Sequence, residues 1–149
     1  MSQKGAIYNE DGISKVFHTQ RYDLVMELVS ARKHSLVAFN WRHERVELCK
    51  LADKLGIEYA YIDGTVPVAR RTEIVRDYQA GKLQVIFCHP QAAGHGLTLT
   101  KGTTTIWCSP SYNAEHFQQM NRRIYRAGQT HKTETIMIAA RDTHETKVY

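Results

Sequence analysis

The sequence predicts an α/β fold, with a mainly parallel central sheet that is covered by helices on both faces. Short β-branched or aromatic runs alternate along the chain with segments of helical periodicity. Several of these runs are apolar almost throughout, as expected for strands that helices cover on both faces. No low-complexity tract, internal repeat or Pro/Gly/Ser linker interrupts the 149 residues. We therefore expect a single domain over residues 1–149.

Five segments have the composition and length of strands. They are Leu36–Phe39, Tyr59–Ile62, Val85–Cys88, Thr103–Trp107 and Thr135–Ala139. Near the N-terminus, the residues at 9–12 are Asn, Glu, Asp and Gly, which are typical of a turn. Residues 1–16 are therefore expected to form a hairpin extension with strands at Ala6–Tyr8 and Ile13–Val16.

Four segments between the strands have helical periodicity. They are Arg21–Ala31, Arg42–Leu55, the segment from Pro67 to just before Gly81, and the segment from Asn113 to Gly128. Gly56 is suited to ending the second helix, Pro67 to the first turn of the third, and Asn113 to an N-cap. Strands separated by helices predict βαβ units, and such units form parallel sheets.

Composition narrows the class of protein. A hydrophobic content of 42% argues against disorder along the chain. The 20 Lys and Arg residues exceed the 15 Asp and Glu residues, and a net charge of +5 suits a partner rich in phosphate. No stretch is long and apolar enough to cross a membrane, and the first residues lack the apolar core of a signal peptide. We expect an intracellular, cytoplasmic protein with no membrane partner.

The cysteines and histidines indicate no metal site. Cys49, Cys88 and Cys108 form no CxxC pair, which is typical of buried free thiols in a reducing compartment. The eight histidines include no pair at helical spacing beside an acidic ligand, and no cysteine joins them at zinc-ligand spacing. We therefore expect no bound metal on this chain.

The helix predicted from Asn113 carries the most specific chemistry. One side of it carries Phe117, Met120 and Ile124, and the opposite side carries Gln119, Arg123 and Arg126. We expect the apolar side to pack on the sheet and the arginines to project from it. Arginine suits a role against phosphate, because its planar fork stays charged and donates two parallel hydrogen bonds. A solvated basic face is the alternative interpretation.

A glycine-containing segment follows the strand that ends at Cys88. In open α/β sheets, ligands bind beyond the carboxyl ends of the strands, where this segment must lie. Gly94 and Gly96 allow backbone amides to approach a phosphate or a sugar closely. A tight turn without a ligand is the alternative. The sequence has no GxxxxGK[ST] loop, so the usual cradle for a triphosphate is missing.

Taken together, these segments resemble motifs of the Swi/Snf-type helicase-like ATPases of superfamily two. The run from Gln119 to Gln129 resembles the last motif of that family, QxxxRxxRxGQ. The run Gly94–Leu99 resembles the preceding motif, and its His-containing form is similar to versions carried by bacteriophages. Tyr61–Thr65, followed by Arg70 and Arg71, resembles a strand, Asp-Gly-Ser/Thr and helix segment of the family.

The resemblance covers about Lys15 to Tyr149 and implies the second, C-terminal RecA-like lobe of a DNA-dependent ATPase or translocase. Such a lobe is a three-layer α/β/α domain. ATP and Mg²⁺ would be held mainly by a first lobe, whose motifs do not occur in this sequence, so the lobe alone should be inactive. The implied partners are that N-terminal RecA-like lobe and DNA, in double-stranded form. A non-catalytic nucleic-acid-binding or protein-docking module is the alternative.

The family pattern also implies roles for individual residues. Arg123 and Arg126 would face the γ-phosphate as catalytic residues, with Arg126 as the arginine finger. The implied nucleotide-binding residues are Gln119, Gly94, Gly96, Arg123 and Arg126. The implied DNA-binding residues are Asn40, Trp41, His89, Gln91 and Thr98. Asn40 as a helix cap and Trp41 as a packing residue are the alternatives at that strand end.

Three further expectations concern residues near these motifs. Asp63 should have a structural role, with its carboxylate bonded to backbone amides of its turn. Arg70 and Arg71 should be solvated helix residues. His89-Pro90 stands where the family more often has Ser-Thr, so a hydroxyl contact with phosphate does not carry over to this chain.

Overall fold

The computed structural model describes residues 11–93, 97–111, 113–124 and 133–138. Its helices are α1 (Asp11–Ser30), α2 (Arg42–Leu55), α3 (Val68–Gln79), α4 (Pro90–Ala93) and α5 (Ala114–Asn121). Its strands are β1 (Ser35–Ala38), β2 (Tyr59–Ile62), β3 (Val85–Cys88), β4 (Thr104–Trp107) and β5 (Glu134–Met137). Within these ranges, no helix is long and apolar enough to cross a membrane.

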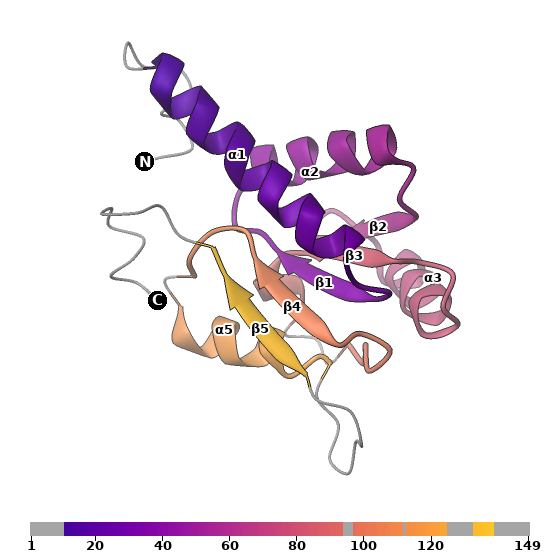
Figure 1. Ribbon diagram of the computed structural model, residues 1–149. Helices are drawn as coiled ribbons and strands as arrows, with labels where there is room; N and C mark the ends of the chain where they lie inside the picture. Colours follow the sequence, from indigo (N-terminus) through magenta and orange to yellow (C-terminus); the bar gives the residue numbers. More distant parts are fainter. Residues whose placement is uncertain (1–10, 94–96, 112, 125–132, 139–149) are drawn as a thin grey trace.

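The strands form a five-stranded sheet in the order β2-β3-β1-β4-β5, and each neighbouring pair is parallel (Figure 1). Leu36 on the central strand β1 is in register with Ile86 on β3 and with Thr105 on β4. The predicted parallel sheet is therefore confirmed. The strand positions agree with the expected apolar runs to within one or two residues.

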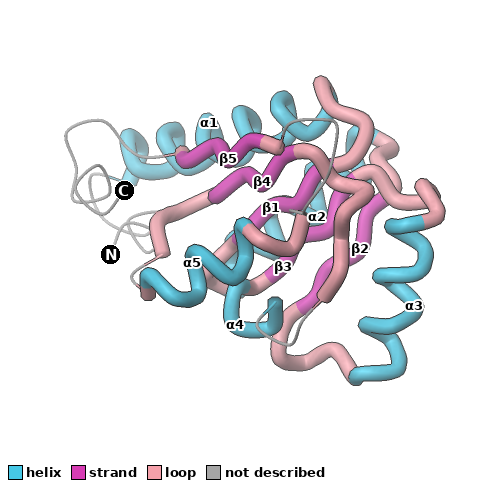
Figure 2. The backbone as a smooth tube through the Cα atoms, turned by 90° about the horizontal axis from the view of Figure 1, so that it is seen from below, coloured by secondary structure: helices cyan, strands magenta, loops and turns pink. Residues whose placement is uncertain are grey.

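Helices cover both faces of the sheet, which confirms the predicted three-layer architecture (Figures 1 and 2). From β1 to β2 the chain moves to the side of the sheet that ends in β2, and from β2 to β5 it moves back to the side that ends in β5. Right-handed crossovers require the connecting helices of these two directions to lie on opposite faces. Accordingly α2 shares one face with α1, and α3, α4 and α5 share the other.

Each face of the sheet has its own apolar cluster. On the face of α1 and α2, the buried residues include Val25, Val29, Leu48, Phe87 and Ile106. On the opposite face they include Leu36, Tyr78, Ile86, Trp107 and Met120. Alternating strand residues contribute to both clusters, which explains why these strands are apolar almost throughout.

The N-terminal hairpin prediction is wrong in its second half. Ile13–Val16, expected as a strand, lies inside α1, which begins ten residues before the expected helix start at Arg21. Val16 and Phe17 lie three and four residues after Ile13, a spacing that fits a helix. The β-branched residues of the same segment suit a strand equally well. The other expected strand, Ala6–Tyr8, lies outside the described residues.

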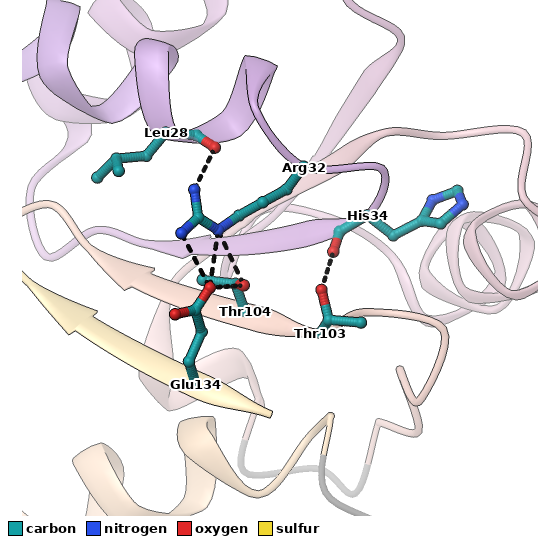
Figure 3. Close-up of polar contacts among 6 residues, drawn as sticks. All are labelled: Leu28, Arg32, His34, Thr103, Thr104 and Glu134. Carbon is teal, nitrogen blue, oxygen red and sulfur yellow. Dashed lines mark hydrogen bonds and ion pairs between the residues drawn. The ribbon is translucent and has the colours of Figure 1, made fainter. Parts of the chain in front are cut away.

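A polar network ties the end of α1 to the amino edge of the sheet, where the strands begin (Figure 3). The Nε atom of Arg32 donates to Glu134 Oε1 at 2.9 Å and to Thr104 Oγ1 at 3.1 Å. Its Nη1 atom donates to the Leu28 carbonyl at 3.0 Å, and its Nη2 atom lies 2.9 Å from Glu134 Oε1. One guanidinium thus joins α1, β4 and β5.

Candidate functional site at the carboxyl edge

The carboxyl ends of the parallel strands meet at one edge of the sheet, which we call the carboxyl edge. Asn40 and Trp41 follow β1, and His89 and Gln91 follow β3. These are four of the predicted DNA-binding residues. Because β1 and β3 are adjacent, the fold brings the four residues to neighbouring strand ends.

The end of β1 is held by the buried carboxylate of Glu44 in the first turn of α2. Its Oε1 atom accepts from the Asn40 amide at 2.8 Å, from the Trp41 amide at 3.1 Å and from Ser109 Oγ at 3.0 Å. Glu44 is fully buried, and this burial raises the pKa of its carboxyl although the hydrogen bonds from Asn40 and Ser109 oppose the shift. This contact was not predicted.

Asn40 and Trp41 differ in how much of each side chain is already engaged. Asn40 Nδ2 donates to Ser109 Oγ at 2.9 Å, to the Ser109 carbonyl at 3.1 Å and to the Pro110 carbonyl at 2.8 Å. The donor of Asn40 thus joins the ends of β1 and β4, and its contact with DNA stays a prediction. Trp41 is 48% exposed, so its indole is open to a partner.

The turn after β2 has the structural role that was expected for Asp63. Its Oδ1 atom accepts from the Thr65 amide at 2.9 Å, and its Oδ2 atom lies 3.3 Å from Arg45 Nε. Burial favours a higher pKa for Asp63, but hydrogen bonds from Thr65 and the charge of Arg45 hold that pKa below its usual value. The Arg45 guanidinium also stacks over the Tyr61 ring, 4.2 Å from its centroid.

Arg71 is not the solvated residue that was expected. Its Nε atom donates to the Val66 carbonyl at 2.9 Å, and its Nη2 atom donates to the Asp63 carbonyl at 3.0 Å. It therefore closes the turn after β2, because its guanidinium joins the Val66 carbonyl to the Asp63 carbonyl, which also accepts from the Val66 amide at 3.1 Å. Arg70 is exposed as expected and pairs with Glu73.

His89 acts as the N-cap of the short helix α4. Its Nδ1 atom accepts from the Gln91 amide at 3.1 Å, which is the bond that a serine or threonine hydroxyl makes at this position. Its ring packs edge-on against Phe39, with centroids 5.8 Å apart. Burial lowers the pKa of His89 although its hydrogen bond with the Asn40 backbone opposes the shift. The lowered pKa and the accepting Nδ1 atom both favour the uncharged ring.

A hollow of about 410 Å³ lies between the ends of β2 and β3. It is lined by Gly64, Arg71, His89, Gln91 and Ala92. Two of these residues were predicted to bind DNA, whereas Gly64 and Arg71 were not assigned to the site. The Asp-Gly-Thr sequence after β2 was the signal that could have placed them there, since it had to end at the same edge.

Helix α5 is anchored as the sequence predicted, but it ends at Asn121, before the expected end at Gly128, so Arg123 and Ile124 follow the helix. The Asn113 side chain accepts from the His116 amide at 3.0 Å and so caps its first turn. Met120 is fully buried, and the Phe117 ring stacks on Trp107 with centroids 4.8 Å apart. Trp107 Nε1 donates to Asn121 Oδ1 at 2.8 Å, which fixes the end of the helix to β4.

Arg123 lies against Leu97 and Leu99, in the second half of the glycine-containing motif. Its Nη1 atom donates to the Leu97 carbonyl at 3.3 Å, and its own carbonyl accepts from the Leu99 amide at 2.9 Å. Its Nε atom donates to the Gln119 carbonyl at 2.8 Å. The structure thus joins the last motif to the preceding motif. Thr98 lies between the two bonded residues and is exposed.

Three predicted site residues, Gly94, Gly96 and Arg126, lie outside the described residues. Within the described ranges, no group of three or more His, Cys, Asp or Glu side chains is placed to hold a metal ion. The described part of the site therefore consists of the ends of β1 to β4 and the hollow, together with Arg123, which is bonded to the segment that follows α4.

Comparison with known proteins identifies this arrangement. Residues 20–128 match the family model described as "Helicase conserved C-terminal domain". The chain belongs to this family. Its relatives place it among Swi/Snf-type members, so it is the C-terminal RecA-like lobe of a Swi/Snf-type helicase-like protein.

Two curated relatives illustrate the range of this family. The lobe is 33% identical over 128 residues to "SNF2 domain-containing protein ENL1" of Oryza sativa subsp. japonica, a match that covers 85% of this chain and 13% of the relative. It is 28% identical over 148 residues to "Putative protein p41" of Acyrthosiphon pisum secondary endosymbiont phage 1, covering 93% of this chain and 30% of that protein. The chain thus spans a minor part of these relatives.

A solved structure shares the fold of the lobe. The crystal structure of the C-terminal part of the Fun30 ATPase domain superposes with a TM-score of 0.79 at 19% sequence identity. The match covers 86% of this chain and 43% of that chain. The RecA-like fold implied by the sequence motifs is therefore confirmed.

Proposed function

We propose that this lobe is the second motor lobe of a DNA-dependent ATPase or translocase, which supplies arginines to a nucleotide held by a first lobe. The observation that carries the proposal is the contact of Arg123 with the carbonyl of Leu97. It joins the end of α5 to the segment that follows α4, and α4 begins at the carboxyl edge, where the exposed Trp41 and the hollow beside His89 also lie. The proposed nucleotide and DNA residues are thus linked through one stretch of chain.

In this function, Arg126 is the arginine finger and Arg123 supports it. A guanidinium beside the γ-phosphate stabilises the negative charge that spreads over the transferring phosphoryl oxygens. Arg123 has two of its donors on main-chain carbonyls, so it keeps the end of α5 against the glycine segment. Gln119, Gly94 and Gly96 would complete the nucleotide-facing surface.

The residues present suit ATP and Mg²⁺ only as the second half of a site. The arginine-bearing helix supplies cations for phosphate, but the sequence has no phosphate loop. When bound, the nucleotide would supply the phosphoryl group, and a first lobe would hold Mg²⁺. We therefore expect this lobe alone to hydrolyse ATP negligibly.

The DNA backbone is the proposed occupant of the hollow at the ends of β2 and β3. Arg71 gives the hollow a fixed positive charge, and Gln91 is an exposed amide at its rim. Phosphate contacts position a protein on DNA without reading sequence, which suits a translocating motor. Trp41, Thr98 and Gln91 are the proposed contacts with open side chains, and His89 and Asn40 support them.

An alanine substitution in the intact two-lobed protein tests the arginine finger. Arg126→Ala should reduce ATP turnover by roughly 10³-fold or more if the guanidinium acts on the transferring phosphoryl group. Arg122→Ala is the matched control, because Arg122 is exposed on the same helix end, and it should change turnover by less than about threefold. Equal effects of the two substitutions would contradict the finger assignment.

DNA binding by the lobe itself tests the second half of the proposal. Fluorescence anisotropy with a labelled duplex should give a weak affinity that falls steeply as salt rises from about 50 to 200 mM, because counterions are released on binding. Gln91→Ala should weaken binding. Absence of any salt-dependent binding would instead favour the alternative function, a protein-docking module.

A further inference from the structure

The buried carboxylate of Glu44 connects two strand ends that lead to different predicted activities. Its Oε1 atom holds the backbone amides of Asn40 and Trp41 at the end of β1. The same atom holds the hydroxyl of Ser109 at the end of β4. Five residues after Ser109, the chain enters α5, the helix that precedes Arg123.

The Asn40 side chain makes a second connection between the same two strand ends. The Asn40 amide group donates to Ser109 Oγ, to the Ser109 carbonyl and to the Pro110 carbonyl. The end of β1 and the end of β4 are therefore joined through the Glu44 carboxylate and through the Asn40 side chain. These two links add to the hydrogen bond of the sheet itself, from the Cys108 amide to the Ala38 carbonyl at 2.9 Å.

The surroundings of Glu44 are unusual for a charged group. Its Oε2 atom has no hydrogen-bond partner within the described residues, and no part of the side chain is exposed. The buried Arg21 of α1 favours the charged carboxylate through its own positive charge, and it donates to the Cys108 carbonyl at 3.3 Å. Burying a carboxylate with incomplete hydrogen bonding opposes folding, and an apolar side chain would pack there at lower cost.

The one gain that the carboxylate brings is geometric. A single oxygen accepts three hydrogen bonds from groups on two strand ends, and no apolar side chain could fix their relative positions in this way. The exposed Trp41 is directly attached to one of those groups. Glu44 thus sets the position of an exposed aromatic residue relative to the start of the arginine-bearing helix.

We propose that Glu44 is a positioning residue that couples the DNA-facing end of β1 to α5, and that it acts through Trp41 and Ser109. The proposal rests on the proposed function, in which Trp41 contacts DNA and α5 faces the nucleotide. Glu44 itself touches neither partner. It fixes the position of the β1 end relative to the start of α5, so that DNA binding at the first surface affects the second.

A double-mutant cycle on DNA affinity tests the link from Glu44 to Trp41. Glu44→Met removes the acceptor and should weaken duplex binding by about tenfold, and Trp41→Ala should do the same if its indole stacks on the DNA. The double variant should be no weaker than either single variant by more than about twofold, because the two residues act as one unit. Glu47→Met makes the same change on the same helix and should stay within about twofold of the parent.

Additive losses in that cycle would overturn the proposal, since Glu44 would then act independently of Trp41. Ser109→Ala provides a milder variant in case Glu44→Met does not fold. It removes only the hydroxyl between the carboxylate and the β4 end, and it should weaken DNA binding by about fivefold. Unchanged binding in a folded Ser109→Ala variant would equally contradict the coupling.

A measurement without DNA separates this proposal from the proposed function. In ¹H–¹⁵N NMR spectra of the lobe, Glu44→Met should shift the amide signals of Trp41 at the β1 end and of Asn113 and His116 at the start of α5. Glu47→Met should leave all three signals in place. Shifts confined to the β1 end would refute the coupling, whereas failure of the parent lobe to bind DNA would refute only the proposed function.

Discussion

The two edges of the sheet each carry a glutamate that joins separate elements, but they do so in opposite ways. At the carboxyl edge, Glu44 is fully buried and its partners are two backbone amides and a hydroxyl. At the amino edge, Glu134 is 53% exposed and its partners are the side chains of Arg32 and Thr104 (Figure 3). The two glutamates therefore differ both in how far they are buried and in the kind of group that they bond.

This difference indicates how the lobe divides its tasks. Exposed ion pairs contribute little to stability, because water screens them and long side chains lose entropy when they are held. Buried hydrogen bonds to main-chain groups fix geometry, because removal of one partner leaves the others unsatisfied. The edge that carries the candidate site is thus held by contacts that determine position, and the other edge by contacts that tolerate change.

Loss of the buried carboxylate should have the largest effect on stability. Glu44→Ala leaves the Asn40 and Trp41 amides and the Ser109 hydroxyl without their acceptor, and it leaves a cavity beside Arg21. We expect a loss of about 3 kcal/mol in the free energy of unfolding, measured by urea denaturation. A loss below about 1 kcal/mol would mean that the carboxylate contributes no more than an exposed one.

The amino edge should prove sensitive to packing rather than to its ion pair. Gly102 precedes β4, and a Cβ atom at this position would overlap the Tyr78 hydroxyl and lie 2.9 Å from Ile124 Cγ2. The Tyr78 hydroxyl is itself fixed by a buried bond of 3.0 Å to the Ser35 carbonyl. Gly102→Ala should therefore cost about 2 kcal/mol by overpacking, as read from the denaturation midpoint.

Gly64→Ala is the control for that substitution, because no atom lies within 4 Å of a Cβ placed on Gly64. It should change the free energy of unfolding by less than about 0.5 kcal/mol. If both substitutions were neutral, the amino edge would have more freedom to rearrange than its packing indicates.

The strands and the anchored helix could be predicted because their signals are local. Val85–Cys88 is apolar throughout and must be covered on both faces, whatever the rest of the chain does. The pattern of Phe117 and Met120 places one side of a helix on the sheet, and the structure has this packing, whereas Ile124 reaches the same apolar cluster from beyond the end of α5. The capping role of Asn113 follows equally from its own side chain.

The roles of Glu44, His89 and Arg71 could not be predicted, since each depends on a partner from another part of the fold. A glutamate in a first helical turn is usually solvated near the positive end of the helix dipole. Only the parallel pairing of β1 and β4 brings Ser109 to it. His89 caps α4 through a ring nitrogen, which sequence rules for N-caps do not include.

The start of α1 shows a different limit. The sequence around its start combines β-branched residues with turn-type residues at 9–12, and both features also suit a hairpin. Local preferences therefore favour neither a helix nor a hairpin. The helix includes this segment, whose apolar spacing fits either period.

The smallest effect should come from the exposed ion pair, and its pH dependence should be opposite to that of the buried carboxylate. Hydrogen bonds from Thr104 and Arg32 lower the pKa of Glu134, so its contribution is complete above the unfolded-state pKa of about 4.3 and is lost as pH falls through the native pKa. Glu134→Gln should cost less than about 1 kcal/mol at pH 7, and nothing in strong acid.

For Glu44 the sign reverses, because burial raises its pKa. The native state then binds the proton more tightly than the unfolded state does, so stability falls as pH rises from about 4.3 through the native pKa. Relative to Glu44→Gln, the parent lobe should be most stable in acid and lose that advantage on approach to neutral pH. Urea denaturation of both variants between about pH 3 and 8 compares the two edges directly, because the two pH windows lie on opposite sides of the ordinary glutamate pKa. Slopes of the same sign would mean that the two glutamates share one kind of environment, and the contrast between buried and exposed edges would be lost.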